Sequence, residues 1–184
     1  MHNNEQEFIQ ACIRKERWAQ QKLYEDHYSQ LMAVCLRYAK DQSEALDILH
    51  EGFIKAFRNI HKYQPGTSIK AWLRRIMVNT SIDYYRKMVR RRTEDIEEVY
   101  DMEGYDPGII DKLSSEEILA LVQTLSPSYR VVFNMYIVEG YSHKEIAEEL
   151  GITESTSRSN LVKARNKMKE LMSLHLGKEV RYHG

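Results

Sequence analysis

The sequence predicts an all-α protein of two helical domains joined by an acidic, flexible linker. Apolar residues recur at helical spacing along most of the 184 residues, and no strand-like alternation persists. Only three prolines and eight glycines interrupt the chain. The net charge is zero, but the charge is unevenly distributed along the chain: residues 1–92 carry +7, residues 93–117 carry −9 and residues 118–184 carry +2. This pattern indicates two domains on a charged tether, with both domains able to share one polyanion.

Catalytic and membrane functions find no support in the sequence. Cys12 and Cys35 lie in apolar helical contexts and are expected to be buried reduced thiols rather than a disulfide or a metal site. The seven histidines show no ligand spacing, and no glycine-rich phosphate loop or nucleophilic triad is present. We therefore expect no cofactor and no enzyme. Because no apolar stretch reaches membrane-spanning length, we expect a cytoplasmic protein without membrane insertion.

The apolar spacing predicts three helices in the first part of the chain, over residues 5–16, over 18–40 and from Asp41 or Ser43 to about Tyr63. Gly52 lies inside the third helix, where glycine costs roughly 1 kcal/mol relative to alanine. Either the glycine permits a close contact or it is incidental. Asp47 and Glu51 form an i, i+4 carboxylate pair, and without a histidine to complete a metal or acid–base site the pair is expected to face solvent or a partner.

The Pro65–Gly66 pair predicts a turn, after which Thr67 or Ser68 caps a further helix. That helix is expected to break at residues 79–81, Asn-Thr-Ser, because these side chains compete for backbone hydrogen bonds. The helical pattern then resumes and ends in three arginines.

Residues 70–92 combine positive charge with aromatic rings. They include eight basic residues and one acidic residue, interleaved with Trp72, Tyr84 and Tyr85. Such a surface suits single-stranded nucleic acid, whose phosphates follow the charge and whose bases stack on flat rings. Trp72 fits a core position equally well, so both interpretations stay open.

Residues 93–112 are acidic and contain Gly104, Pro107 and Gly108, which predict a flexible linker. The linker serves solubility, or its charge screens the first domain from DNA when nothing else is bound.

The C-terminal part predicts a helix-turn-helix. Helix starts are expected at Ser114 or Ser115, at Ser126–Pro127, at Ser142 and at Thr153. Glu145 completes a capping box with Ser142, and Gly151 is placed to end the helix in a left-handed conformation. The last helix carries five basic residues and no acidic one between residues 155 and 169. Such a helix can enter a major groove, but an ordinary helical hairpin with a solvated cationic face shows the same pattern.

Three segments in this order resemble the sigma-70 family of bacterial sigma factors, in the extracytoplasmic-function (ECF) group. They are ALDILHEGFIKAFRNIHKY, similar to the core-polymerase-binding helix, IKAWLRRIMVNTSIDYYRK, similar to the promoter-melting segment, and LSPSYRVVFNMYIVEGYSHKEIAEELGITESTSRSNLVKARNKMKEL, similar to the domain that reads the upstream promoter element. The resemblance runs from about Phe8 to Met172.

The resemblance implies a dissociable specificity subunit that directs promoter recognition, DNA melting and transcription initiation. Residues 1–92 would be the region 2 domain, 93–112 the acidic linker, 113–176 the region 4 helix-turn-helix domain and 177–184 a flexible tail. The implied partners are core RNA polymerase, through the coiled coil of its largest subunit, promoter DNA and an anti-sigma factor. The linker would run toward the RNA-exit path of the polymerase.

The resemblance also assigns roles to residues of this chain. Polymerase contacts are expected at Asp47, Glu51 and Phe53. Contacts with the unpaired minus-ten strand are expected at Lys70, Trp72, Arg74, Arg75, Asn79 and Arg86, with a flipped base received at the helix break. Upstream-element contacts are expected at Ser155, Thr156, Arg158, Ser159, Asn160, Lys163 and Arg165.

Four positions depart from the family pattern. His50 stands where glutamine is usual, Gly52 where a larger residue is usual, Ser157 in place of an apolar residue and Asn160 in place of a frequent arginine. Because asparagine favours adenine when it binds in a bidentate manner, the upstream sequence that this protein reads is expected to differ. An Asn160→Arg variant with unchanged base preference would count against that expectation.

Two rival interpretations remain. A response-regulator-type transcription factor would have a similar helix-turn-helix, but the first half lacks an alternating strand–helix receiver pattern. A helical interaction protein without a DNA role predicts that Arg158→Ala and Lys163→Ala leave DNA retention unchanged.

Overall fold

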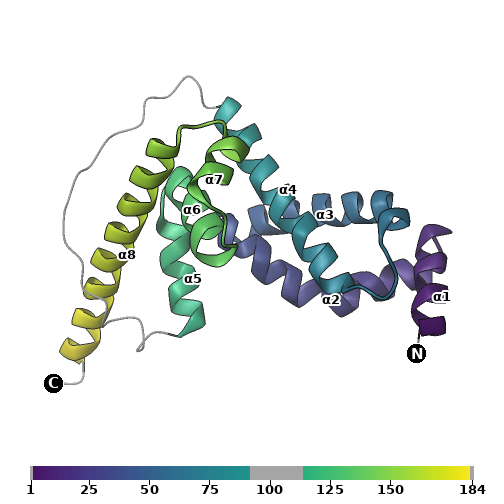
Figure 1. Cartoon of the computed structure of the whole chain (residues 1–184). Helices are drawn as coiled ribbons and strands as arrows, with labels where there is room; N and C mark the ends of the chain where they lie inside the picture. The colour runs from purple at the N-terminus through teal and green to yellow at the C-terminus, as the bar shows by residue number, and fades with distance from the viewer. Residues whose placement is uncertain (1, 92–113, 183–184) are drawn as a thin grey trace. The chain divides into compact units, whose positions relative to one another are not determined.

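The computed structural model of the protein describes residues 2–91 and 114–182, with side chains over 5–91 and 114–173 (Figure 1). Every regular element in these ranges is a helix, which confirms the all-α prediction. The chain divides into two compact units between Tyr84 and Tyr85, within a helix that itself continues to Arg91. The predicted acidic linker, 93–112, lies outside the described residues.

The first unit is built from helices α1 (His2–Ile13), α2 (Arg17–Tyr38), α3 (Gln42–Asn59), the short η1 (Ile60–Lys62) and the part of α4 (Ile69–Arg91) up to Tyr84. Helix α2 packs along α3, while α1 packs on α2 and η1. The core between these helices consists of large side chains that are almost fully buried, among them Leu23, Leu31, Ile48, Leu49, Leu73, Met77 and Ile82. Cys12 and Cys35 are free and buried, as predicted.

Helix α3 starts at Asp41 rather than Ser43. The Asp41 side chain accepts a hydrogen bond from the backbone N–H of Glu44 at 2.9 Å, which caps the helix. Near the middle of α3, a Cβ placed on Gly52 would lie 2.2 Å from the Sδ of Met77 on α4. The glycine therefore permits a close contact between the two helices, which decides between the two explanations that the sequence left open.

Helix α4 is continuous, so the predicted break at residues 79–81 is wrong. The Thr80 hydroxyl donates to the carbonyl oxygen of Ile76 at 2.7 Å, and the Ser81 hydroxyl donates to that of Met77 at 2.9 Å. Both hydroxyls thus bond back to the preceding turn of the same helix instead of competing with it. Both residues are also buried, so packing against the core holds the helix together at this point.

The second unit contains α5 (Ser115–Thr124), α6 (Pro127–Phe133), the π-helical turn η3 (Asn134–Val138), α7 (His143–Leu150) and α8 (Glu154–Tyr182). Helices α5, α6 and α7 each pack on α8. One core cluster joins Val122, Leu125, Ala164 and Met168, with Ile118, Leu121, Tyr129 and Phe133 packed against it.

The predicted caps of this unit are confirmed. Ser114 and Ser142 each form a capping box with the glutamate three residues later, and Ser126 caps α6 with proline in its first turn. The π-helical turn after α6 was not predicted. Helix α8 continues to Tyr182. The expectation of a flexible tail over 177–184 stays a prediction. No helix in the described part of the chain is long and apolar enough to span a membrane.

Candidate functional site

Helix α3 exposes one acidic edge. Asp47 and Glu51 are exposed and lie one turn apart, as their spacing predicts. His50 is exposed beside them, and Ile54 is 49% exposed one turn after His50. Ile54 was not singled out from the sequence as a surface residue, although the helical period places it away from the apolar side of α3. The edge therefore combines two carboxylates with an apolar side chain.

Phe53 does not belong to this edge. Its side chain is 3% exposed, and its ring lies 4.6 Å from the ring of Tyr24 on α2 and 6.0 Å from that of Phe57. The residue was expected to contact polymerase, but a buried ring cannot make that contact without unpacking α2 from α3. We therefore assign Phe53 to the core and leave it out of the surface.

Side-chain contacts tie α4 to α3 beneath the exposed edge. Lys55 Nζ lies 3.0 Å from Asp83 on α4 and 3.8 Å from Glu51 on its own helix. Tyr84 approaches the start of α3, where burial and the Glu44 carboxylate raise the pKa of the phenol. These side-chain contacts join α3 to α4, so the acidic edge of α3 and the outer side of α4 are held by the same group of interactions.

Helix α4 brings four of the six expected strand-binding residues onto one side. Trp72, Arg75, Asn79 and Arg86 follow one another at spacings of three, four and seven residues, which correspond to one face of a helix. Arg75 and Asn79 are exposed, and the other two are half-buried. With α4 continuous, Asn79 presents its amide from the middle of a helix rather than from a break.

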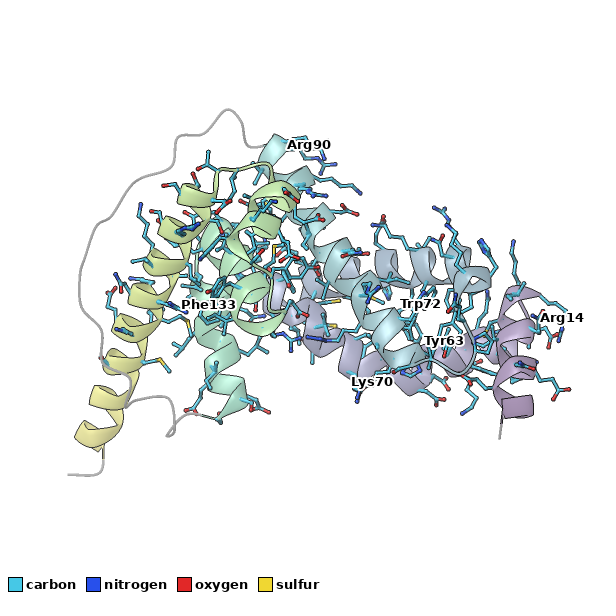
Figure 2. The ribbon with its side chains drawn as sticks, viewed as in Figure 1. Arg14, Tyr63, Lys70, Trp72, Arg90 and Phe133 are labelled. Atoms are coloured by element: carbon cyan, nitrogen blue, oxygen red, sulfur yellow. The ribbon has the colours of Figure 1, made fainter. Side chains whose placement is uncertain are left out.

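The remaining two expected strand-binding residues, Lys70 and Arg74, lie on a different side of α4, because they are offset by about half a turn from Trp72. Trp72 is half-buried, and its ring makes an edge contact with the buried Tyr63 at a centroid distance of 5.8 Å (Figure 2). The ring therefore packs on one side and remains accessible on the other, so the two interpretations of Trp72 are compatible.

The turn between α7 and α8 has the predicted helix-turn-helix geometry. Gly151 adopts φ 68°, ψ 34° and ends α7, and the backbone N–H of Thr156 donates to the Thr153 hydroxyl at 3.0 Å to begin α8. Ile146 and Ala147 are buried on the inner side of α7, which packs on α8. The small side chain of Ala147 allows the close approach of these two helices.

The outer side of α8 carries the seven residues expected to contact the upstream element, and these residues differ in their exposure. Exposed are Ser155, Thr156, Arg158, Ser159 and Arg165, and half-buried are Asn160 and Lys163. Arg158 is held by Glu154 one turn earlier, with a nitrogen-to-oxygen distance of 2.6 Å. Val162 is 54% exposed among these residues and was missed; the helical period alone places it with Ser155 and Ser159. An apolar group there suits the methyl group of a thymine.

Behind that surface, His143 connects α7 to α8. Its Nδ1 lies 2.9 Å from the hydroxyl of Ser157, which is fully buried, and its ring stacks on Tyr136 at a centroid distance of 4.5 Å. The guanidinium of Arg165 lies 5.9 Å from the centre of the Tyr136 ring. The departure at Ser157 therefore has a structural reason, because its hydroxyl bonds to His143 where an apolar residue would only pack.

Comparison with known proteins agrees with this geometry. Residues 23–93 match the family model of sigma-70 region 2, and residues 115–168 match that of sigma-70 region 4. The two matches occur in this order and together cover more than half of the chain. The chain belongs to the sigma-70 family. Its function is that of a sigma factor, promoter recognition in transcription initiation.

The relatives place this sigma factor in the ECF group. The ECF RNA polymerase sigma factor SigE of Mycolicibacterium smegmatis is 31% identical over 159 residues, which span 84% of this chain and 62% of that protein. The ECF RNA polymerase sigma factor SigM of Mycobacterium tuberculosis is 26% identical over 180 residues, which span 95% of this chain and 88% of the relative. The sigma factor RpoE of Bartonella quintana, solved in complex with the anti-sigma factor NepR, aligns with a TM-score of 0.49 at 21% identity over 83% of this chain and 96% of that one.

Proposed function

We propose that this sigma factor divides promoter recognition among three helical surfaces. The acidic edge of α3 docks on the coiled coil of the largest subunit of core polymerase, the outer side of α4 holds the unpaired minus-ten strand, and the outer side of α8 reads the minus-thirty-five element. One observation carries the proposal: each of the three helices buries its apolar side and leaves most of the residues expected for one function together on the opposite side. The chemistry of phosphodiester formation stays with the polymerase.

The α3 edge is suited to a reversible protein interface. Asp47 and Glu51 offer charge that attracts a basic partner, and such charge raises the rate of association more than the final affinity. Ile54 adds an apolar side chain between them and the end of the helix, where burial on docking contributes free energy that salt does not screen. We therefore expect polymerase binding to weaken with salt without being abolished.

The α4 surface combines the three kinds of contact that an unpaired strand requires. Arg75 and Arg86 can neutralise phosphates, the accessible side of Trp72 offers a stacking surface, and the Asn79 amide can donate to and accept from a base edge. Because Arg75 and Asn79 lie one turn apart on the same side, a strand that follows the helix meets both.

The α8 surface is suited to a major groove. Arg158, Ser159 and Val162 lie together near the helix start, the part of a recognition helix that contacts base edges. Lys163 and Arg165 lie further along and can reach phosphates, which fix the register of the helix without reading sequence.

Run-off transcription tests the proposal. Purified sigma factor is added to sigma-free core polymerase from its own organism, with sheared genomic DNA as template. We expect discrete transcripts that vanish with Asp47→Arg or Glu51→Arg, because charge reversal turns attraction at the α3 edge into repulsion. Glu7→Arg is the matched control, since Glu7 is an exposed carboxylate on α1 away from that edge.

Two other results would contradict the proposal. Transcripts that persist at wild-type levels with both reversals would remove α3 from the polymerase interface. Sequence-specific DNA binding by the free protein, with no transcript at all, would instead favour the conventional transcription factor.

We also propose that the protein acts in the cytoplasm and is held inactive there by an anti-sigma factor. The relatives are sigma factors that serve RNA polymerase, and the acidic and basic surfaces described above are those that such a partner would have to cover. A protein that abolishes run-off transcription, and whose effect is overcome by excess core polymerase, would be that partner. Inhibition that excess polymerase cannot overcome would contradict competition for these surfaces.

A further inference from the structure

The loop between η1 and α4, over residues 63–68, is fastened to the protein from outside the region 2 match. That match begins at residue 23, whereas the fastening residue is Glu5 on α1. We propose that Glu5 is a positioning residue for promoter melting: it fixes this loop, and through Tyr63 it fixes Trp72 as a preformed stacking surface for a base of the unpaired strand. The inference rests on the proposed function of α4.

The Glu5 carboxylate makes two bonds to the loop. One oxygen accepts from the Tyr63 hydroxyl at 2.8 Å, and the other accepts from the backbone N–H of Gly66 at 3.2 Å. These partners lie 58 and 61 residues away along the sequence. Gly66 adopts φ 90°, a conformation that other residues rarely reach, so its N–H points in a direction set by the turn. Both oxygens of one carboxylate thus accept hydrogen bonds from a single loop.

The Tyr63 hydroxyl is the centre of the arrangement. It lies 2.5 Å from the carbonyl oxygen of Thr67 as well as 2.8 Å from Glu5, so its one proton is shared between two acceptors. Burial and the bond to Glu5 raise the pKa of Tyr63, which keeps this proton in place at neutral pH. Tyr63 is 4% exposed, whereas residues 64–68 are exposed. Packing therefore holds the tyrosine, and hydrogen bonds hold the rest of the loop.

The same tyrosine reaches Trp72. The Tyr63 ring meets the Trp72 ring edge-on at 5.8 Å, and Figure 2 shows the two rings next to the start of α4. The backbone at Trp72 is fixed as well, because its N–H donates to the carbonyl oxygen of Ser68, the last residue of the loop, at 3.0 Å. Loop, tyrosine and tryptophan thus form a continuous path that ends at the accessible side of the Trp72 ring.

A preformed ring favours binding, because a base can stack on Trp72 without first having to fix the orientation of its side chain. Fixing a mobile side chain on binding costs free energy that would otherwise contribute to affinity. Glu5 removes this cost before the strand arrives, since the carboxylate orders the loop in the free protein. The consequence falls on strand capture, not on docking to polymerase, because Asp47 and Glu51 lie on α3 and take no part in this path.

Permanganate reactivity of unpaired thymines tests the inference. Holoenzymes are assembled with wild type, Glu5→Ala, Tyr63→Phe and the double variant, on the promoter fragment that wild type selects in run-off transcription. We expect each single change to lower open-complex formation roughly three- to tenfold, which corresponds to the loss of one ordinary intramolecular hydrogen bond. The double variant is expected to lose little more than either single one, because both changes break the same path. Glu7→Ala, an exposed carboxylate on the same helix, is expected to behave as wild type.

Polymerase affinity of the same variants separates positioning from general stability. Unchanged affinity together with reduced opening supports the inference, and amide exchange that accelerates only over residues 63–72 agrees with it. Wild-type opening with Glu5→Ala overturns it. Equal loss of polymerase affinity and opening also overturns it, since Glu5 would then stabilise the whole unit. If wild type itself gives no transcript, the proposed function fails before this experiment begins.

Discussion

Gly52 shows how one missing side chain sets the packing of two helices. A Cβ at this position would lie 2.2 Å from the Sδ of Met77, so the fully buried thioether would have to shift within a close-packed core. Overpacking costs about 1–3 kcal/mol, whereas alanine in a helix gains only about 1 kcal/mol over glycine. We therefore expect Gly52→Ala to lower the free energy of unfolding by roughly 1 kcal/mol, measured by urea denaturation.

A second substitution checks the cause of that loss. Met77→Val shortens the opposing side chain and leaves room for a methyl group at position 52. The alanine is then expected to cost less in the Met77→Val background than in wild type, which a double-mutant cycle measures. Equal costs in both backgrounds would show that Met77 is not the obstacle.

His143 gives a pH dependence with a defined sign. Burial, followed by the nearby charges of Arg158 and Arg165, lowers its pKa below the ordinary value of about 6.5, although Glu154 opposes this. The folded protein therefore binds fewer protons than the unfolded chain as pH falls below about 6.5. We expect α7 and α8 to lose stability from there down to the folded pKa, with no further loss below it.

Amide hydrogen exchange of α7 measures this effect. At each pH the wild type is compared with His143→Gln, which keeps a hydrogen-bonding side chain but does not titrate. The protection of wild type relative to the variant is expected to fall as the pH is lowered from about 7.5 through 6.5. His61→Gln, a change at an exposed histidine of the first unit, is the control and should leave the α7 profile unaltered. A wild-type profile parallel to that of His143→Gln would contradict the assignment.

At the scale of single residues, charge and helical spacing together predict which side chains are exposed and which are buried. Asp47 and Arg158 are exposed as expected, because charge alone keeps them in water. Phe53 and Ile54 are neighbours of similar polarity, yet one is buried and the other is half-exposed. The helical period already separates them, because Phe53 lies one turn after the buried Leu49 on the apolar side and Ile54 lies off that side. The surface role expected for Phe53 therefore conflicted with its own spacing.

Among elements, the helix ends were the most predictable feature. Ser114, Ser142 and Gly151 act through bonds to residues within four positions, so their local sequence was sufficient. The continuity of α4 was not predictable in this way. Thr80 and Ser81 have a choice between bonding back into the helix and breaking it, and burial of both side chains against the core decides that choice.

The recognition helix α8 allows a test of the element as a whole. Lys163 lies on its outer side with Ser159, whereas Lys167 follows one turn further from the start of the helix and its charge is paired with Glu170 at 2.9 Å. We expect Lys163→Ala to weaken binding of the holoenzyme to promoter duplex at all sequences alike and to lower the salt slope by about one. Lys167→Ala removes the same charge and is expected to change neither. Fluorescence anisotropy at several salt concentrations measures both, and equal effects of the two changes would mean that net charge alone governs binding, whatever the position or pairing of the lysine.

For the whole molecule, the distribution of charge predicted two helical domains on either side of an acidic segment, and the observed helices confirm the two domains. Two regions rich in helices flank the acidic segment, and each builds a separate core. What the sequence did not contain is the link from α1 to the loop before α4. Glu5 and Tyr63 are separated by 58 residues, and neither belongs to a recognisable motif, so only the folded chain brings them together.

The acidic segment between the two units leads to a prediction for the full chain. Residues 93–112 carry eight acidic residues and one basic residue, next to a block of +7. If this charge screens the first unit from DNA, replacing the eight carboxylates with their amides should tighten binding of the free protein to non-promoter duplex roughly tenfold at low salt. The gain should shrink toward 1 M salt, where the Debye length falls to about 3 Å. A variant with the same residues in scrambled order is expected to match wild type, because net charge and not sequence produces the screening. Affinity that stays at the wild-type value after neutralisation, at low salt, would assign the segment to solubility alone.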